Sequence, residues 1–112
     1  MRQNSTLSTQ SEIRRILIRR AKSQKLITYA ELTALLRTTR LIPNSRFLSE
    51  LLTRISIGED SAGRGLLSAV VVTKRHGIPG IGFFTKLGAR VRRTEFRRRW
   101  IKDLAKVYAA WK

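Results

Sequence analysis

The spacing of apolar residues predicts two helices in the first third of the chain. In residues 9–22 the apolar side chains recur along one helix face, and Thr9 with Glu12 has the form of a capping box. Thr28 and Glu31 repeat this pattern, so a second, short helix is predicted directly after Thr28. The predicted buried positions of these helices are Ile13, Ile16, Leu17, Ala21, Leu32, Leu35 and Leu36.

A third helix is predicted over residues 44–57. Pro43 forces the residue before it into an extended conformation, and Asn44 or Ser45 then offers an N-cap. Gly58 is expected to end the helix. The predicted buried stripe of this helix is Phe47, Leu48, Leu51, Leu52 and Ile55.

Residues 66–84 are the part of the chain least compatible with a helix. An apolar, β-branched run at 66–72 is followed by a turn-forming cluster at 74–80 and by a second short apolar run at 81–84. This pattern predicts a β-hairpin with a basic tip. The tip residues are Lys74, Arg75 and His76.

An amphipathic C-terminal helix is predicted after Thr94, a candidate N-cap. Its apolar stripe is formed by Phe96, Trp100, Leu104, Val107 and Trp111. Helical spacing explains this stripe as core packing or as the contact of a homodimer, rather than as a platform for base stacking. A homodimer through this helix is therefore one expectation for the assembly.

The charge of the chain indicates its class of partner. Among 112 residues there are 24 Lys and Arg against 7 Asp and Glu, which gives a formal net charge of +17. Such self-repulsion costs stability unless a polyanion neutralises it, and nucleic acid is the commonest polyanion. The apolar fraction of 42% is that of a folded protein rather than of a disordered basic tail. The length predicts one domain, residues 9–112, after a flexible arm at 1–8.

Several functional classes are disfavoured by the residues present. The chain has no cysteine and no apolar run long enough for a membrane span, so no thiolate metal site and no membrane partner are expected. Glu59 and Asp60 are interpreted as turn residues, and His76 as an accessory hydrogen-bonding residue. We therefore expect neither an enzyme nor a cofactor, and a cytoplasmic, nucleoid-associated location.

The outer face of the predicted helix at 44–57 carries short polar side chains around one arginine. A helix that lies in the major groove of DNA needs small side chains and a few hydrogen-bonding groups, so this face is predicted to read base edges. Glu50 on the same face counts against that interpretation, because phosphates repel a carboxylate. The predicted DNA contacts are Arg37, Arg40, Asn44, Ser45, Arg46, Ser49, Thr53, Lys74, Arg75, His76, Arg90, Arg92, Arg93 and Arg97.

The order of the predicted elements resembles the winged helix-turn-helix class. That order is helix, short helix, helix, hairpin and terminal helix. The resemblance implies an α+β, mainly helical fold in which the hairpin at 66–84 is the wing and the helix at 44–57 enters the major groove. The implied function is that of a double-stranded DNA-binding protein, a transcriptional regulator or a nucleoid or phage DNA-binding factor.

A second resemblance is to the DNA-binding domain of alkyltransferase-like proteins. The stretch ITYAEL at residues 27–32 is similar to a helix start of that family, Ser45 and Arg46 stand where the family has its base-displacing arginine, and Gly77 and Gly80 follow in the predicted hairpin. The reactive Pro-Cys-His-Arg motif is absent. The resemblance therefore implies that Arg46 enters the base stack and that a DNA lesion is recognised without chemistry.

Two other functions remain open at this point. A small basic domain is also typical of RNA-binding or ribosome-associated proteins, and the apolar C-terminal helix is typical of a protein-binding adaptor. Duplex DNA is the expected partner, with structured RNA as the alternative.

Overall fold

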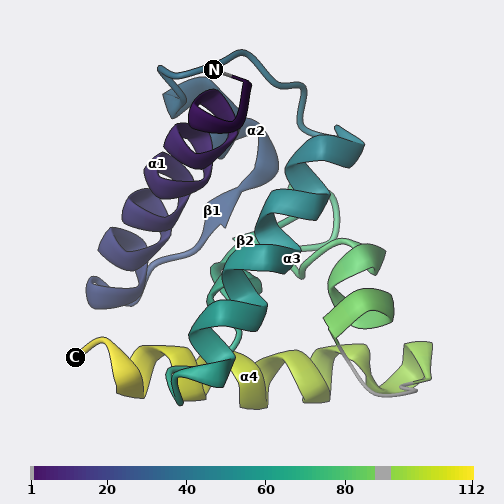
Figure 1. The fold of residues 1–112 in the computed structure, drawn as a ribbon. Coiled ribbons are helices and arrows are strands. Elements are labelled where there is room, and N and C mark those ends of the chain that lie inside the picture. Colours follow the sequence, from purple (N-terminus) through teal and green to yellow (C-terminus); the bar gives the residue numbers. More distant parts are fainter. Residues whose placement is uncertain (1, 88–91) are drawn as a thin grey trace.

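In residues 2–87 and 92–112, which the computed structural model describes, the chain forms four α-helices and one small parallel sheet (Figure 1). The helices are α1 (Arg2–Lys22), α2 (Tyr29–Leu35), α3 (Arg46–Ser61) and α4 (Phe96–Ala110). The strands are β1 (Ile27–Thr28) and β2 (Val71–Val72), and three shorter helical turns are η1 (Leu67–Val70), η2 (Phe83–Leu87) and η3 (Arg93–Glu95). The protein is mainly helical and α+β, as predicted.

The core is arranged around η1, which contacts α1, α3 and α4. All four residues of η1 are buried, and the indole Nε1 of Trp100 on α4 donates a hydrogen bond to the carbonyl of Ala69 at 2.7 Å. In Figure 1, α4 runs across the lower ends of α1 and α3. The radius of gyration, 13.1 Å, is that of a single folded body of this length.

The first helix begins before its predicted start, and the predicted capping box at Thr9 and Glu12 is wrong. Residues 2–8, for which a flexible arm was expected, continue α1. The hydroxyl of Thr9 bonds that of Thr38 at 2.8 Å, and the carboxylate of Glu12 accepts the backbone N–H groups of Arg37 and Thr38. Inside a helix the backbone N–H groups are already bonded, so these side chains are free to hold a distant loop instead.

The predicted starts of α2 and α3 are confirmed. Thr28 and Glu31 form a complete capping box, and the Ser45 hydroxyl accepts the N–H of Leu48. The predicted end of α3 is wrong, because the helix passes through Gly58 to Ser61. Glu59 in its last turn is buried and bonded to two arginines, which holds that turn in place.

Four of the five predicted buried positions of α3 are confirmed. Leu48, Leu51, Leu52 and Ile55 are buried, whereas Phe47 is 37% exposed.

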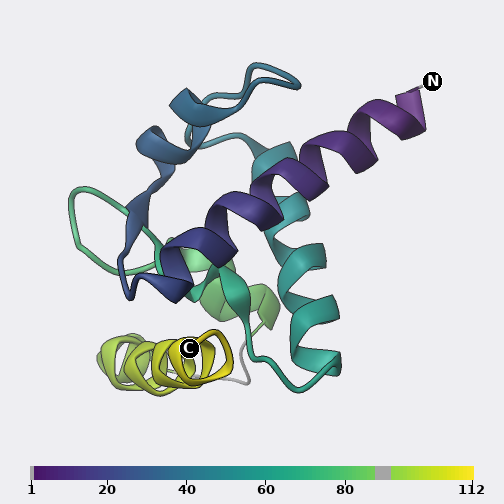
Figure 2. The ribbon, with the colours of Figure 1, turned by 90° about the vertical axis from the view of Figure 1, so that its left-hand side faces the viewer.

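The predicted hairpin at 66–84 is wrong, although its turn is present. Residues 67–70 are helical, and β2 pairs in parallel with β1, with Ile27 opposite Val71. The second apolar run does not return as a strand but is helical at residues 81–87. Pro79 has no N–H to donate to a ladder, and the N–H of Gly80 bonds the Tyr29 hydroxyl instead. The second apolar run therefore packs beside α3 as η2, and the loop at residues 73–80 extends outward (Figure 2).

The C-terminal helix is confirmed, but its cap is not. The N-cap position is Glu95 rather than Thr94, and a turn of 3-10 helix precedes it. The apolar stripe of α4 packs on the core of its own chain, with Trp100 and Val107 buried. The homodimer through this helix stays a prediction, because the structure describes a single chain. Within the described residues, no helix is long and apolar enough to cross a membrane.

Candidate functional site

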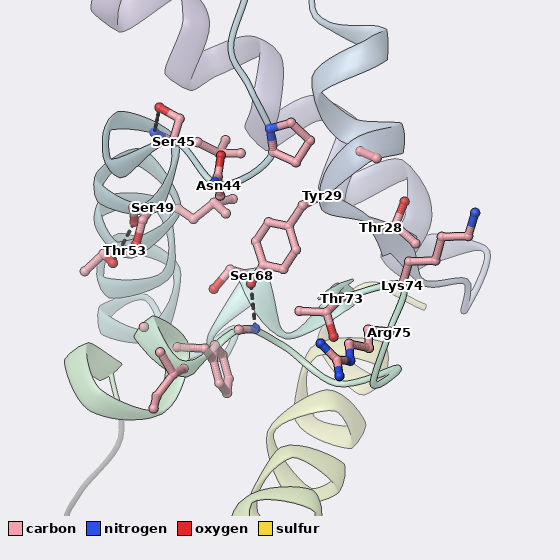
Figure 3. Close-up of a pocket in the computed structure, with 18 of the residues that line it drawn as sticks. Thr28, Tyr29, Asn44, Ser45, Ser49, Thr53, Ser68, Thr73, Lys74 and Arg75 are labelled. Carbon is pink, nitrogen blue, oxygen red and sulfur yellow. Dashed lines mark hydrogen bonds between the residues drawn. The ribbon is translucent and has the colours of Figure 1, made fainter.

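A pocket of about 490 Å³ opens between α2, α3 and the segment that follows β2 (Figure 3). Its first wall is the start of α2, its second is the N-terminal half of α3 with the residues before it, and its third is residues 73–87. We call it the α2–α3 pocket. The described lining residues are Thr28, Tyr29, Ala30, Pro43, Asn44, Ser45, Leu48, Ser49, Leu52, Thr53, Ser68, Thr73, Lys74, Arg75, Gly80, Ile81, Gly82, Phe83 and Leu87.

The first wall is positioned by the capping box of α2. The Thr28 hydroxyl accepts the N–H of Glu31 at 3.1 Å, and the Glu31 carboxylate accepts the N–H of Thr28 at 3.0 Å. This bond pair fixes Tyr29 as the first helical residue, and its ring lies in the middle of the pocket view (Figure 3). Its phenol oxygen accepts the N–H of Gly80 at 2.9 Å, which ties α2 to the third wall.

Tyr29 is present as a neutral phenol. Burial raises its pKa above the ordinary value of 10.0, and the hydrogen bond from the Gly80 N–H opposes only part of that effect. Among the described residues no acceptor is bonded to the phenol hydrogen, so that hydrogen can be donated to a ligand.

The second wall is a line of small hydroxyl side chains on α3. Ser45, Ser49 and Thr53 are spaced by four residues and so lie on one face of the helix. The Thr53 hydroxyl donates to the Ser49 carbonyl at 2.9 Å, and the Ser49 hydroxyl accepts from Lys86 at 3.4 Å. A Cβ on Gly82 would approach the Ser49 hydroxyl to 3.2 Å. Glycine at 82 and serine at 49 therefore allow the third wall to come close to α3.

The third wall brings Lys74 and Arg75 to the pocket from the turn after β2. Thr73 closes this turn, because its N–H donates to the Ile78 carbonyl and its own carbonyl accepts the Gly77 N–H, both at 2.8 Å. Gly77 has φ +69, a backbone conformation that glycine adopts without strain. Both cations are exposed, and neither is in an ion pair within the described part of the chain.

The structure brings six of the predicted DNA contacts to this pocket and leaves the others elsewhere. Those that line it are Asn44, Ser45, Ser49, Thr53, Lys74 and Arg75. Arg37 lines a second hollow on the other side of α2. Six more are exposed and line neither hollow, namely Arg40, Arg46, His76, Arg92, Arg93 and Arg97. Arg90 lies outside the described residues.

The polar face of α3 was predicted to point outward, and most of it does not. Ser45, Ser49 and Thr53 line the pocket, and Ser56 is fully buried. The reason is that η2 packs against this side of α3, with Phe83 and Phe84 buried. The exposed side chains of α3 include four charged residues, Arg46, Glu50, Arg54 and Asp60, and two apolar ones, Phe47 and Ile57.

Sequence reasoning missed Tyr29, the aromatic side chain of the pocket. It was interpreted only as the first residue of a helix. The signal that could have identified it is a large side chain fixed by a capping box, together with a glycine at position 80. At Gly80 a Cβ would lie 3.3 Å from the Tyr29 hydroxyl.

The chemistry of the described lining residues suits binding. Hydroxyl groups, one amide, one amine and one guanidinium surround apolar side chains, and this described lining includes no carboxylate or imidazole. Within residues 2–87 and 92–112, no group of three or more His, Cys, Asp or Glu side chains could hold a metal ion. Such a pocket can hydrogen-bond a flat polar ligand and attract an anion at its rim.

Comparisons with protein-family models, with curated proteins and with solved structures give no match to this chain.

Proposed function

We propose that this protein binds duplex DNA with the face that carries the α2–α3 pocket, and that the pocket receives one base turned out of the helix. The observation that carries the proposal is the pocket itself: a concave site with an aromatic ring, hydroxyl groups and two unpaired cations, in a chain of net charge +17. Binding is proposed to occur without a chemical reaction.

In this proposal the exposed cations of the protein supply the affinity for the phosphate backbone of DNA. Lys74 and Arg75 stand on a turn whose backbone is held by Thr73, so they can meet phosphates without first being ordered. Other exposed arginines add further phosphate contacts. If six to ten phosphates are contacted in total, the logarithm of the affinity falls with the logarithm of salt concentration with a slope of about -5 to -9.

The pocket explains selectivity for a weakened base pair. Turning a base out of the stack costs a few kcal/mol, and the cost is least for a mismatched or damaged base. A turned-out base needs a flat apolar slot and hydrogen-bonding partners for its edge. The Tyr29 ring with Leu48 and Phe83 meets the first need, and the hydroxyl groups of α3 meet the second.

Arg46 has a separate role in this proposal. It is the first residue of α3, directly after the pocket residue Ser45, and its side chain is exposed. We propose that the Arg46 side chain fills the space that the turned-out base leaves in the stack. This role agrees with the resemblance of residues 27–32 and 45–46 to alkyltransferase-like proteins.

The test compares a matched duplex with the same duplex carrying one mismatched 2-aminopurine, whose fluorescence rises when it leaves the stack. We expect about tenfold tighter binding of the mismatched duplex and a fluorescence rise on binding. Lys74→Ala with Arg75→Ala should weaken binding of both duplexes. Arg46→Ala should suppress the fluorescence rise.

A matched pair of variants isolates the pocket. Thr53→Leu adds volume to the pocket wall, whereas Thr33→Leu makes the same change on α2 outside the pocket. Both hydroxyl groups bond a carbonyl of their own helix, so the two replacements remove equivalent interactions. We expect Thr53→Leu alone to abolish the preference for the mismatch.

Two results would overturn the proposal. Equal binding of both duplexes by the wild type would exclude the base pocket, and a salt slope near -1 would exclude binding dominated by phosphates. A competition with structured RNA tests the alternative function. If RNA bound about tenfold tighter than DNA of equal length, the protein would be assigned to RNA instead.

A further inference from the structure

We propose that a second hollow, between α1 and the end of α2, is a binding site for phosphoryl groups. Its volume is about 420 Å³. It is separate from the α2–α3 pocket, because the first turn of α2 lines that pocket whereas Leu35, at the other end of α2, lines this hollow. We call it the arginine hollow, and its described lining residues are Glu12, Arg15, Ile16, Arg19, Arg20, Leu35 and Arg37.

The charges in the arginine hollow are not balanced. Four guanidinium groups face one carboxylate, that of Glu12. Both oxygens of this carboxylate are already occupied, because they accept the N–H of Arg37 at 2.9 Å and the N–H and hydroxyl of Thr38 at 3.1 and 2.8 Å. In the part of the chain that the structure describes, none of the four arginines forms an ion pair.

Several other cations of the protein do have acidic partners. Arg14, Arg64, Arg99 and Lys106 are all paired with acids. The protein has few acids, and those near the arginine hollow bond backbone groups instead. Because converging guanidinium groups repel one another, an anion that enters the hollow removes this repulsion and is bound more strongly than at a flat surface.

The arrangement is also held in place before any ligand arrives. Glu12 ties the loop at residues 37–38 to α1, and the bond between Thr9 and Thr38 adds a second link. These links hold the loop that carries Arg37 against α1, which carries Arg15 and Arg19. Arg20 is held by a separate bond, because its Nη1 donates a 3.1 Å hydrogen bond to the Leu26 carbonyl.

Glu12 stays ionised in this role. Burial acts to raise its pKa, but the hydrogen bonds from the backbone of Arg37 and Thr38, from the Thr38 hydroxyl and the charge of Arg15 outweigh it and hold the pKa below 4.5. The carboxylate is therefore a structural link and does not release its bonds near neutral pH.

The arginines suit a phosphoryl group in particular. The guanidinium fork donates two parallel hydrogen bonds to a pair of phosphate oxygens, and several forks can share one such group. Arg15 and Arg19 are one helical turn apart, about 6 Å along α1, so they can hold neighbouring phosphates. The phosphates of a nucleic-acid backbone and those of a free polyphosphate offer the same chemistry.

The test is a titration of the full chain with inorganic pyrophosphate, followed by NMR of the arginine Nε–H signals. We expect saturable shifts at Arg15, Arg19, Arg20 and Arg37. Arg15→Ala with Arg19→Ala should weaken pyrophosphate binding by about tenfold, since two forks are lost. Thermal unfolding should show that this variant is folded, because both side chains are exposed on a helix.

The matched control is Arg54→Ala with Arg98→Ala, which removes the same charge from exposed helix positions that line neither hollow. We expect this control to change pyrophosphate affinity by less than about twofold. Equal weakening by the two double variants would mean that only net charge matters, and it would overturn the proposal. Absence of saturable shifts in the wild type would overturn it as well.

A second titration, in which duplex DNA is added to the protein with bound pyrophosphate, identifies the source of the phosphoryl group. Displacement of pyrophosphate by duplex DNA would assign the site to a nucleic-acid backbone, and its retention would assign the site to a free polyphosphate. Both results uphold a phosphoryl site. The variant of Lys74 and Arg75 should keep its pyrophosphate shifts, so this inference and the proposed DNA function can fail independently.

Discussion

The two ends of α3 present small polar side chains to different surroundings. Near its C-terminal end, Ser56 is fully buried and its hydroxyl both donates to the Ser68 hydroxyl at 2.6 Å and accepts the Ser68 N–H at 2.9 Å. Near its N-terminal end, Ser45 and Ser49 face the open α2–α3 pocket. Serine on α3 is therefore fully buried at position 56, where it bonds the pocket residue Ser68, and lines the open pocket at position 49.

The charges follow the same division. At the closed end the carboxylate of Glu59, 3% exposed, bonds both Arg14 and Arg64. Both guanidinium groups also lie over the Trp111 ring, at 5.9 and 5.6 Å from its centroid. At the open end, Lys74 and Arg75 form no ion pair with an acid among the residues that the structure describes. An acid is used where the fold needs a link between helices, and cations are left unpaired where a ligand can approach.

Glu59→Gln should remove the two ion pairs at the C-terminal end of α3 and have the largest effect on stability. The amide keeps the shape of the carboxylate but loses the charge that both arginines bind, so we expect the free energy of unfolding to fall by about 2–3 kcal/mol in urea titrations. Asp60→Asn is the matched control. Its carboxylate is about half exposed and 3.5 Å from Lys106, so it should cost less than about 1 kcal/mol. Equal losses would mean that Glu59 is no more than a surface acid.

The pH dependence of the same variant provides a second check. Burial acts to raise the pKa of Glu59, but the hydrogen bonds and charges of Arg64 and Arg14 outweigh it and hold the pKa below 4.5. The unfolded chain then binds this proton more readily, so the contribution of Glu59 is complete above about pH 4.5 and is lost as the pH falls through the folded-state pKa. As the pH falls from about 4.5 through the folded-state pKa, wild type should therefore lose stability more steeply than Glu59→Gln.

Ser56→Ala and Ser49→Ala compare the two ends of α3 directly. The first removes the hydroxyl that bonds two buried polar groups of Ser68, its hydroxyl and its backbone N–H, so it should cost about 1–3 kcal/mol. The second removes a hydroxyl from the wall of an open pocket, where water can take its place, and should cost no more than about 0.5 kcal/mol. Similar losses in thermal and urea unfolding would show that the pocket end is as tightly sealed as the other.

Local signals in the sequence predicted a helix start correctly where the capping side chains have no competing partner far along the chain. Thr28 and Glu31 form the expected capping box because both side chains lie near the surface, where each can bond the backbone N–H of the other residue. Thr9 and Glu12 have the same spacing, yet Thr9 is only 1% exposed and both side chains bond the loop at 37–38. A rule based on local spacing takes no account of a partner that lies far along the chain, so the box at Thr9 and Glu12 was predicted wrongly.

The pocket could be predicted only in part, for the same physical reason. The run of β-branched residues before Thr73 correctly indicated a strand at Val71, but its partner is Ile27, more than forty residues earlier, in a parallel pair. A parallel pair needs a long connection, and the sequence offers no local turn signal for it. Once β2 pairs with β1, the following segment is directed against α3, and the serines that suggested a groove-binding face line a pocket instead.

A small expected change in stability tests the hydrogen bond that Tyr29 makes across the pocket. Tyr29→Phe keeps the ring in the pocket but removes the acceptor of the Gly80 N–H, which should cost about 1 kcal/mol or less because this site is partly open to water. The consequence for binding should be larger than the consequence for folding. Tyr29 joins α2 to the wall that carries Lys74 and Arg75, so without this bond the rim is less well ordered and the phenol can no longer donate to a base. We expect Tyr29→Phe to lose most of the preference for a mismatched duplex in the fluorescence assay while its unfolding curve stays close to that of the wild type. A variant that retained the full preference would show that the ring alone defines the slot and that the hydroxyl serves only the fold.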